Sequence, residues 1–324
     1  MKKQWLLGAA AALTFALAGC GENASEAKTS ADKQEKQAAE EKVEATEQTI
    51  SYLGKDYTVK VPAKSIVAAS LEAMEDAAIL GIKPTGVLEI AGEIPSYLAK
   101  DLAGAELIGD KRAPNAEAVL TLNPDVIVGT SKWGEDVMAE MNKIQTTLPY
   151  SHISTNWKEN LTVLAKVAGK EDAAAKIIAD YDEKAKTAKA EVAKQLADKQ
   201  ILIIRVRGGL MYIYPANTFL NPVLYEDLGA KVPEVIANVQ AQAEITMETL
   251  ASVNPDAIFL QFEDSENTDA PTALEDLQKD PIFSSLKAAQ DGQVFVNSVD
   301  PLAQGGTAWS KVKFLDAAVE NLLK

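Results

Sequence analysis

The sequence predicts an α/β protein with two Rossmann-like lobes, each a parallel sheet flanked by helices, joined by one long rigid helix. One sequence unit occurs twice, from Glu117 to Val128 and, 131 residues later, from Glu248 to Phe259. It consists of a predicted helix that carries a Glu, an Asn-Pro-Asp motif that ends the helix, and an apolar strand. Proline ends each helix because it lacks the N–H that a helix needs and disfavours the α region for the residue before it. Between the copies, residues 157–196 are rich in Ala, Lys and Glu, with apolar side chains at helical spacing. The repeat predicts the paired lobes, and the long helical stretch predicts their connection.

The first residues predict export. A basic start at Met1–Lys3 is followed by an apolar segment that ends in Leu17-Ala18-Gly19-Cys20. This segment is too short for a permanent membrane span and is typical of a secretory signal, which we assign to residues 1–19. Small residues before a Cys resemble the lipobox of lipoproteins, so we expect Cys20 to be a lipidated N-terminus on the extracytoplasmic face of the cell membrane. Cys20 is the only cysteine, which excludes an internal disulfide, and a buried free thiol is the alternative.

Residues 20–49 are mostly Lys, Glu, Ala, Ser and Thr without an apolar period. Such a segment cannot bury a core, so we expect a flexible tether between the lipid anchor and the folded part. The net charge of the whole chain is −15, which argues against a nucleic-acid partner because phosphate binding needs a basic face. The charge of the ligand is left open, since a few residues of the site set it.

The first lobe is expected over residues 50–155. An alternating segment at 50–61, with Gly54-Lys55 in its turn, predicts a small strand pair. Helices are predicted at 71–80, at the first repeat and at 137–144. Short apolar runs predict buried strands at 66–69, 86–88, 106–109 and 126–128 and a weak strand at 149–153.

The connecting helix is expected over residues 156–197 and the second lobe over residues 198–324. Gly169-Lys170 interrupts the connecting stretch, and a helix of about 25 residues after it would span roughly 38 Å. In the second lobe, strands are predicted at 200–206, 211–214, 257–262 and 293–296, and helices at 221–228, at the second repeat and at 308–323.

Catalysis is poorly supported by the sequence. His152 is the only histidine, and no G-x-S-x-G elbow, P-loop or G-x-G-x-x-G fingerprint occurs. A zinc site built from several histidines is excluded by that count. We therefore expect a binding protein with no catalytic residue and no metal site. We expect His152 to be structural, and axial ligation of a haem together with Met138 or Met141 is the alternative.

The three arginines are the leading candidates for ligand contact. Arg112 lies in the loop before the first repeat helix, and Arg205 and Arg207 lie two apart at the end of an apolar strand. Ligands of parallel sheets sit outside the carboxyl ends of the strands, and strand residues two apart share a face. A charge there is costly to bury without an anionic partner, and guanidinium groups match oxygen-rich anions. An internal salt bridge to one of the many carboxylates is the alternative.

Aromatic residues lie near these positions in the sequence. Trp133 follows the strand of the first repeat, Tyr214 follows the paired arginines, and Trp309 follows Gly305-Gly306. Trp and Tyr side chains can pack on the flat or aliphatic parts of a ligand. Core packing is the alternative for each of them.

Glu117 and Glu248 occupy the same offset in the two repeat units, each in the first turn of its helix. The helix dipole favours a carboxylate there, so helix capping is one interpretation. The same Glu in both lobes also suits docking onto a symmetric partner.

Together these features resemble the class III solute-binding proteins of ABC importers, in the branch that carries ferric siderophores. The resemblance covers roughly residues 60–324 and rests on the lipobox, the Pro114-Asn115-Ala-Glu117 … Asn123-Pro124-Asp125 pattern, its second copy and the connecting helix. It implies two lobes with little relative motion, a shallow cleft between them, and one Glu per lobe that pairs with arginines of a permease dimer. By motif match, these are Glu117 and Glu248.

The resemblance also implies ligand contacts. In hydroxamate- and citrate-type members, an Arg before the Pro-Asn motif and an Arg-x-Arg pair contact the ligand, and Arg112, Arg205 and Arg207 match these positions. Two positions depart from the family pattern. Trp133 stands where many relatives carry a basic residue, and the frequent Trp before the final Gly-Gly is absent.

We therefore expect a lipid-anchored, monomeric receptor that captures a ferric siderophore of the hydroxamate or citrate type and delivers it to an ABC permease. The iron(III)–siderophore complex would be the ligand, with no other cofactor. The three arginines would hold its oxygen atoms, and the apolar walls would be Trp133, Tyr214 and Trp309. Haem or cobalamin binding on the same fold is the first alternative, and a surface hydrolase is the second.

Overall fold

The structure is a computed structural model that describes residues 44–111 and 113–323. The predicted signal, Cys20, most of the predicted tether and Arg112 lie outside the described residues. The first strand starts at Thr46, so the end of the tether predicted at residue 49 is wrong. Polar residues misled that prediction, because Thr46–Thr49 are exposed but complete an antiparallel ladder, in which Thr46 pairs with Val61.

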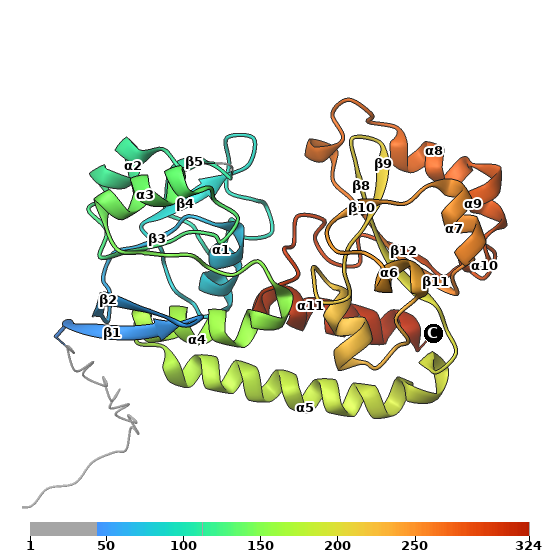
Figure 1. Cartoon of the computed structure of the whole chain (residues 1–324), viewed down its shortest axis with the longest axis horizontal. Coiled ribbons are helices and arrows are strands. Elements are labelled where there is room, and N and C mark those ends of the chain that lie inside the picture. The colour runs from blue at the N-terminus through green and yellow to red at the C-terminus, as the bar shows by residue number, and fades with distance from the viewer. Residues whose placement is uncertain (1–43, 112, 324) are drawn as a thin grey trace, which may run out of the picture. The chain divides into compact units, whose positions relative to one another are not determined.

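The first lobe (residues 44–156) is built on a five-stranded parallel sheet in the order β5-β4-β3-β6-β7, as predicted (Figure 1). Its strands are β3 (Ile66–Ala68), β4 (Gly86–Glu89), β5 (Glu106–Asp110), β6 (Val126–Val128) and β7 (Thr147–Leu148), and its helices are α1 (Leu71–Ile79), α2 (Ala116–Thr121) and α3 (Glu135–Ile144). The strand predicted at 149–153 is wrong. The chain forms β7 just before Pro149, which has no N–H for a ladder.

An antiparallel pair, β1 (Thr46–Tyr52) and β2 (Lys55–Val61), lies beside this sheet and packs on α4. The turn between the two strands is Leu53-Gly54, one residue earlier than predicted. Both turn residues have positive φ, 48° and 78°, which is the backbone form that a two-residue hairpin turn prefers.

The second lobe (residues 197–323) is built on a five-stranded sheet in the order β10-β9-β8-β11-β12. β8, β11 and β12 are parallel, whereas β9 and β10 are antiparallel, so this sheet is mixed and not wholly parallel as predicted. Gly208 and Gly209 make the tight turn that folds β9 back onto β8. The strands are β8 (Ile201–Arg207), β9 (Leu210–Ile213), β10 (Ala243–Glu244), β11 (Ala257–Phe262) and β12 (Val294–Val296).

Short helices surround this sheet. The helix predicted at 221–228 is a π-helix, η2 (Val223–Asp227), and a 3-10 turn, η3 (Asp264–Glu266), follows β11. The α-helices are α6 (Glu234–Ala237), α7 (Met247–Val253), α8 (Ala273–Lys279), α9 (Pro281–Ser285), α10 (Lys287–Gln290) and the C-terminal α11 (Ala308–Leu322).

The predicted interruption at Gly169-Lys170 divides the connection between the lobes into two helices. After the 3-10 turn η1 (Ser154–Asn156), α4 (Trp157–Ala168) packs on β1, β2 and α1, and α5 (Glu171–Leu196) packs on α11 and η2. Gly169 ends α4 in the left-handed conformation, φ 64°, and Figure 1 shows the chain doubling back there. Only α5, with 26 residues, runs from one lobe to the other.

The repeated Asn-Pro-Asp motif has the same structural role in both lobes. The Asn of each copy has positive φ, 46° and 45°, and ends its helix. The Asp then holds the start of the neighbouring parallel strand. Asp125 accepts a hydrogen bond from Ser65 N at 3.1 Å, before β3, and Asp256 accepts one from Gln200 N at 2.8 Å, before β8. The prediction that the two units are built alike is confirmed.

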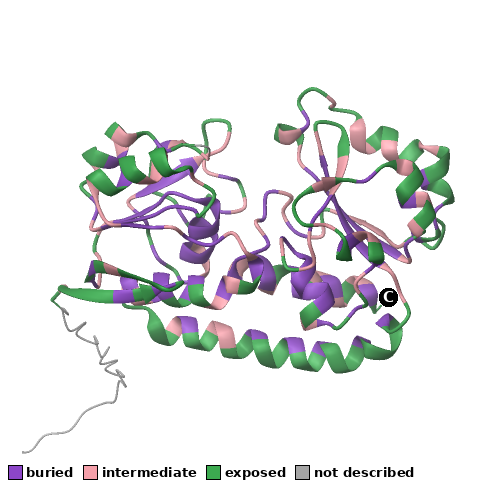
Figure 2. Cartoon of the chain, in the orientation of Figure 1, coloured by how far each residue is buried: buried purple, intermediate pink, exposed green. Residues whose placement is uncertain are grey.

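Figure 2 shows buried residues along both sheets and on α1 and α11. α1 of the first lobe meets the N-terminus of α11 through Glu75 and Asp76, two buried neighbours on α1. Asp76 accepts hydrogen bonds from Ala308 N and the Tyr150 hydroxyl, both at 2.8 Å. Glu75 accepts hydrogen bonds from Tyr97, Gln304, Thr307 and Ser310.

Burial raises the pKa of Glu75 to about 7 and that of Asp76 to about 8. We call these two residues the acid pair. They form a polar joint between the lobes that is separate from α5. Across the described part of the chain, none of the helices combines the length and the hydropathy that a membrane span requires.

Candidate functional site

A hollow of about 260 Å³ lies between the lobes and is the inner hollow of the site. The first lobe contributes residues that follow β3, β5 and β6, and the second lobe contributes the end of β8 and the loop after β11. This is the carboxyl-end location expected of ligand sites on parallel sheets. The lining residues are Ser70, Leu71, Glu72, Leu88, Lys111, Thr130, Lys132, Arg205, Arg207, Glu266, Leu302 and Gln304.

Four cations converge on this hollow, Lys111 and Lys132 from the first lobe and Arg205 and Arg207 from the second. Arg205 and Arg207 alternate with Val206 on β8 and therefore share a face, as predicted. Their exposures differ, because the Arg205 side chain is 7% exposed and the Arg207 side chain 34%. The prediction that the pair faces the gap between the lobes is confirmed, while Arg112 is outside the described residues.

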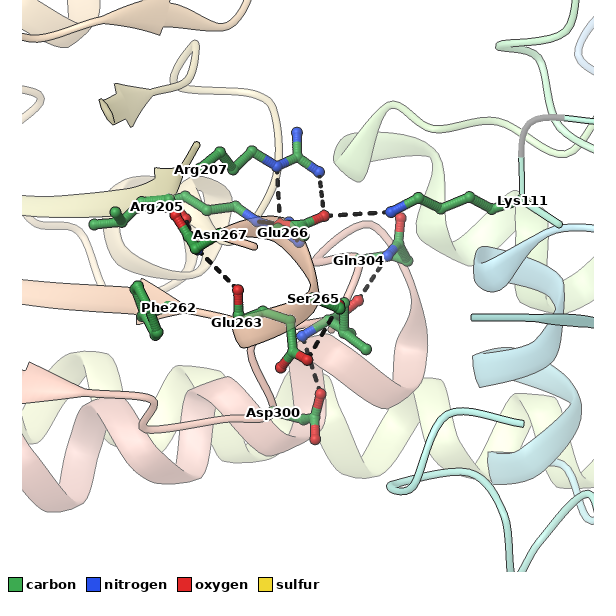
Figure 3. Close-up of polar contacts among 12 residues, drawn as sticks. Lys111, Arg205, Arg207, Phe262, Glu263, Ser265, Glu266, Asn267, Asp300 and Gln304 are labelled. Carbon is green, nitrogen blue, oxygen red and sulfur yellow. Dashed lines mark hydrogen bonds and ion pairs between the residues drawn. The ribbon is translucent and has the colours of Figure 1, made fainter. Parts of the chain in front are cut away.

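Glu266, on the loop after β11, binds three of the four cations (Figure 3). Its Oε2 accepts hydrogen bonds from Arg205 Nε at 3.0 Å and Arg207 Nε at 2.9 Å. Its Oε1 lies 2.7 Å from an Arg207 terminal nitrogen and 3.3 Å from Lys111 Nζ. The salt-bridge alternative for the arginines is therefore correct in part, because they face the hollow and are already paired with a carboxylate inside it.

The cations determine the protonation state of Glu266. Burial acts to raise its pKa, but the hydrogen bond from Arg207 and the charges of Arg205, Arg207 and Lys111 lower the pKa to about 2. Glu266 is therefore an anion at neutral pH. The Lys111–Glu266 ion pair joins one lobe to the other across the site.

The fourth cation follows the same pattern within the first lobe. Lys132 Nζ lies 2.7 Å from Glu72, whose side chain is 4% exposed, whereas that of Lys132 is 48% exposed. Two buried carboxylates, Glu72 and Glu266, thus hold the more exposed cations Lys132, Lys111 and Arg207 at the surface of the hollow. Among the described lining residues the four cations exceed these two carboxylates, so the site favours an anion.

A second hollow of about 580 Å³, the outer hollow, adjoins the first. The two share Lys111, Arg207 and Glu266 in their linings, so the ion pairs of Glu266 stand between them. The other lining residues of the outer hollow are Ile90, Ala91, Asp110 and Ser265. A hollow of about 500 Å³ elsewhere in the second lobe includes Glu244, Asp276 and Asp280 in its lining and suits an anion poorly.

Tyr214, the third predicted ligand wall, lies beside the arginines but lines neither inter-lobe hollow, so this prediction is corrected as well. Its hydroxyl donates to Gln242 Oε1 at 3.0 Å, and Arg207 donates to the same oxygen at 3.0 Å. Its ring packs on Phe219, and the Arg205 guanidinium lies 5.4 Å from the centre of the Phe219 ring. These contacts help to hold both arginines on the site face of β8.

The two tryptophans predicted as ligand walls do not line either inter-lobe hollow. Trp133 folds back over Gly129, where even a single Cβ would clash with its ring. Trp309 packs on Tyr97 with ring centres 4.9 Å apart. Both predictions are corrected in favour of the packing alternative, because a position near a strand end does not fix the direction of a side chain.

His152 and the methionines do not assemble a haem site. His152 Nδ1 lies 2.8 Å from the Ser131 hydroxyl, and burial and the charge of Lys132 lower the pKa of its imidazole. Met141 is fully buried in the core of the first lobe, and Met138 lies on the same helix, α3. None of these three residues lines the inter-lobe hollows.

Glu117 and Glu248 are exposed in the first turns of α2 and α7. Asn115 and Thr246 cap these helices, so both glutamates lie at a helix N-terminus as predicted. Hydrogen bonds at the helix start lower the pKa of Glu248. Their role in docking stays a prediction.

Sequence reasoning missed Lys111, Lys132, Glu72 and Glu266. Lys111 lies two residues and Lys132 four residues after a predicted strand (106–109 and 126–128), so the carboxyl-end rule that selected the arginines could have found them. Glu72 starts the helix after β3 and could have been found in the same way. Glu266 had no such signal, because it is one of several carboxylates in an acidic loop.

Comparison with known proteins agrees with this geometry. Residues 66–298 match a family described as periplasmic binding protein. The chain is 45% identical over 311 residues to the iron-uptake system-binding protein of Bacillus subtilis (strain 168), covering 96% of this chain and 95% of the relative. It is 30% identical over 298 residues to the iron(3+)-hydroxamate-binding protein FhuD of the same organism, covering 90% of this chain and 88% of FhuD.

Solved structures give the same picture. The crystal structure of the triscatecholate siderophore-binding protein FeuA from Bacillus subtilis, complexed with ferri-bacillibactin, superposes with a TM-score of 0.82 at 47% identity. The match covers 85% of this chain and 98% of FeuA. The two-lobed α/β architecture predicted from the sequence is confirmed.

Proposed function

This chain belongs to the periplasmic binding protein family, and on that premise we propose that it captures a ferric siderophore outside the cytoplasm and presents it to an ABC importer. The observation that carries this proposal is the cluster of four cations around the inner hollow. Such a cluster repels a free metal ion and attracts an anionic complex. The role is one of binding, without a chemical step.

The cargo that fits best is a ferric tris-catecholate. This corrects the expected hydroxamate or citrate type, because the chain is 47% identical to a triscatecholate-binding protein and 30% identical to a hydroxamate-binding one. The charges favour the same choice. Iron(III) held by three doubly deprotonated catechols is a trianion, whereas a ferric trihydroxamate is neutral, so only the former gains fully from clustered cations.

The residues divide into contacts and anchors. Lys111, Lys132 and Arg207 have partly exposed side chains and would meet the catecholate oxygens and ring faces. Arg205 is almost fully buried against Glu266 and would support the site from behind. The apolar contacts to the catechol rings would come from Leu71, Leu88 and Leu302.

Titration of single variants with a ferric tris-catecholate, followed by fluorescence quenching, tests the proposal. Lys132→Gln and Arg207→Gln should each weaken binding by about tenfold or more, since a charged hydrogen bond contributes about 1.5–3 kcal/mol. Lys158→Gln is the matched control, because Lys158 also pairs with a carboxylate, Asp182, but lies on α4 outside the hollow. Unchanged affinity in both site variants would refute the proposed site.

Glu117 and Glu248 would dock the loaded protein onto a permease with matching basic residues, one lobe to each half. Both are exposed at equivalent places in the repeated units. The double charge reversal Glu117→Lys, Glu248→Lys should abolish iron uptake by cells and leave cargo affinity unchanged. Glu191→Lys, an exposed glutamate on α5, is the control and should transport normally. Loss of affinity in the double variant would contradict a docking role.

Cys20 would carry the lipid that holds the protein at the membrane surface, where it would act as a monomer. The motif Leu17-Ala18-Gly19-Cys20 supports this proposal. Cys20→Ala should release the protein from the membrane fraction and stop incorporation of labelled palmitate. Retention of label in this variant would contradict lipidation at Cys20.

A further inference from the structure

The carboxylate of Glu266 occupies the position where an anionic cargo would be expected. It binds Lys111, Arg205 and Arg207 at once, and its side chain is 8% exposed. It also stands between the inner hollow of about 260 Å³ and the outer hollow of about 580 Å³. Both linings contain Glu266 and the two cations that bind its Oε1, Lys111 and Arg207. A cargo that occupies both hollows must displace these ion pairs.

The loop that carries Glu266 is fixed to the neighbouring hairpin. Glu266 O accepts a hydrogen bond from Gly208 N at 2.9 Å, at the turn between β8 and β9. The Asn267 side chain donates to Val206 O at 3.0 Å and accepts from Gly209 N at 3.1 Å. These hydrogen bonds fix the backbone of Glu266 to the turn between β8 and β9.

The two oxygens of this carboxylate differ in what holds them. Oε2 is bound by the buried Arg205, whose terminal nitrogen lies 2.8 Å away, and by Arg207 Nε. Oε1 is bound by the more exposed groups, the Arg207 terminal nitrogen and Lys111 Nζ. The Lys111 and Arg207 side chains are 35% and 34% exposed, so a ligand can reach them, whereas Arg205 is shielded.

We propose that Glu266 is an internal stand-in for the cargo. It holds Lys111 and Arg207 while the site is empty, and cargo binding transfers these two cations from Oε1 to the cargo's own oxygen atoms. The exchange removes the inter-lobe ion pair and joins the two hollows into one site. The inference rests on the proposed function, and Glu266 is then a specificity-determining residue, because only a strongly anionic cargo can compete with it.

The test is a titration of wild type and Glu266→Gln with a ferric tris-catecholate. Glutamine keeps the size of the side chain and an oxygen acceptor for Arg205 but removes the competing charge. The variant should bind the trianion about tenfold more tightly at low salt, as expected when one like charge is removed from a partly buried site. The gain should shrink as the Debye length falls from about 30 Å to about 3 Å between 0.01 M and 1 M salt.

Glu263→Gln is the matched control. It makes the same charge change in the same loop, and the Glu263 side chain accepts from Ser265 and not from the cations. Its gain in affinity should be well below that of Glu266→Gln, because the Glu263 carboxylate lines neither hollow and does not compete for the cations. Equal or weaker binding by Glu266→Gln, or the same gain in both variants, would overturn the proposal.

A crystal structure of the wild-type complex is the second measurement, and it does not depend on the stability of a variant. Lys111 Nζ should lie on a catecholate oxygen and beyond about 4 Å from Glu266. An intact Lys111–Glu266 pair with cargo bound would overturn the proposal. Failure of wild type to bind any ferric tris-catecholate would instead refute the proposed function, so the two failures are distinguishable.

Discussion

Two sets of carboxylates join the lobes, and their surroundings are opposite. Glu75 and Asp76 accept hydrogen bonds from hydroxyls and backbone amides at the start of α11, and burial raises the pKa values to about 7 and about 8. Glu266 meets two guanidinium groups and one ammonium group, and its pKa falls to about 2. Carboxylic acids thus join the two lobes in two different ways.

The difference indicates which contact is permanent and which is exchangeable. The donors to the acid pair are part of the fold, and a ligand cannot replace them. The cations on Glu266 are partly exposed at a hollow, and an anionic ligand can replace the carboxylate there. We therefore regard the acid pair as a structural joint and Glu266 as a part of the binding site.

The largest expected effect comes from breaking the joint. Glu75→Ala removes the acceptor shared by Tyr97, Gln304, Thr307 and Ser310, which leaves buried donors unpaired. We expect a loss of about 3–5 kcal/mol in the free energy of unfolding, measured by urea denaturation. Cargo affinity of the folded fraction should stay near wild type, and a large loss of affinity would show that the joint also shapes the site.

Removing the buried anchor of Glu266 should have the next largest effect on stability. Arg205→Gln leaves Glu266 with fewer partners in a buried position, and we expect a loss of about 2–4 kcal/mol. Arg207→Gln removes a more exposed partner and should cost less than about 1 kcal/mol of stability while weakening cargo binding more. Thermal denaturation measures both variants, and equal costs would contradict the division into anchor and contact.

The two sets should give opposite pH dependence of unfolding. The native state keeps Glu75 and Asp76 protonated to a higher pH than the unfolded chain does. Their contribution to the free energy of unfolding is therefore complete below about pH 4 and is lost as pH rises toward 8. The contribution of Glu266 is present above about pH 4.5 and is lost as pH falls toward 2. The free energy of unfolding, measured by urea denaturation at a series of pH values, should show both limbs and should fall between pH 5 and pH 8.

Variants show which carboxylates cause each limb of the pH dependence of unfolding. Glu75→Gln should reduce the limb at higher pH, with the Asp76 contribution remaining, and Glu266→Gln should flatten the acid limb. Loss of the acid limb in Glu75→Gln would contradict the assignment.

The smallest expected effect is that of Lys111→Gln in the ligand-free protein. It removes one partly exposed inter-lobe ion pair, which is worth less than about 1 kcal/mol. Hydrogen exchange should rise in the loop after β11 and stay unchanged at the start of α11, where the acid pair remains. Faster exchange at both places would show that the two contacts act as one unit.

Much of the fold follows from local sequence signals. Pro124 and Pro255 stop their helices, and Gly169 marks the break before α5 where the sequence predicts it. The reversal of direction at Gly169 is not predictable locally, because it depends on how α4 packs on the first lobe. The antiparallel edge of the second sheet was missed although Gly208-Gly209, a two-residue turn between two strands, is a local signal for it.

The candidate site was predicted only in part. Arg205 and Arg207 were found because charges are rare at the end of an apolar strand. Lys111 and Lys132 were missed because lysine is common in this chain. Trp133 and Trp309 were wrongly placed, since their side-chain directions depend on contacts with Gly129 and Tyr97 that only the folded structure supplies.

The most direct test of the account compares wild-type affinity for a trianionic ferric tris-catecholate with that for a neutral ferric trihydroxamate, by fluorescence quenching at the same ionic strength. If Lys111, Lys132 and Arg207 select the cargo by its charge, the protein should prefer the catecholate by at least about 100-fold. Equal affinities, or a preference for the neutral complex, would contradict the claim that these cations choose the cargo.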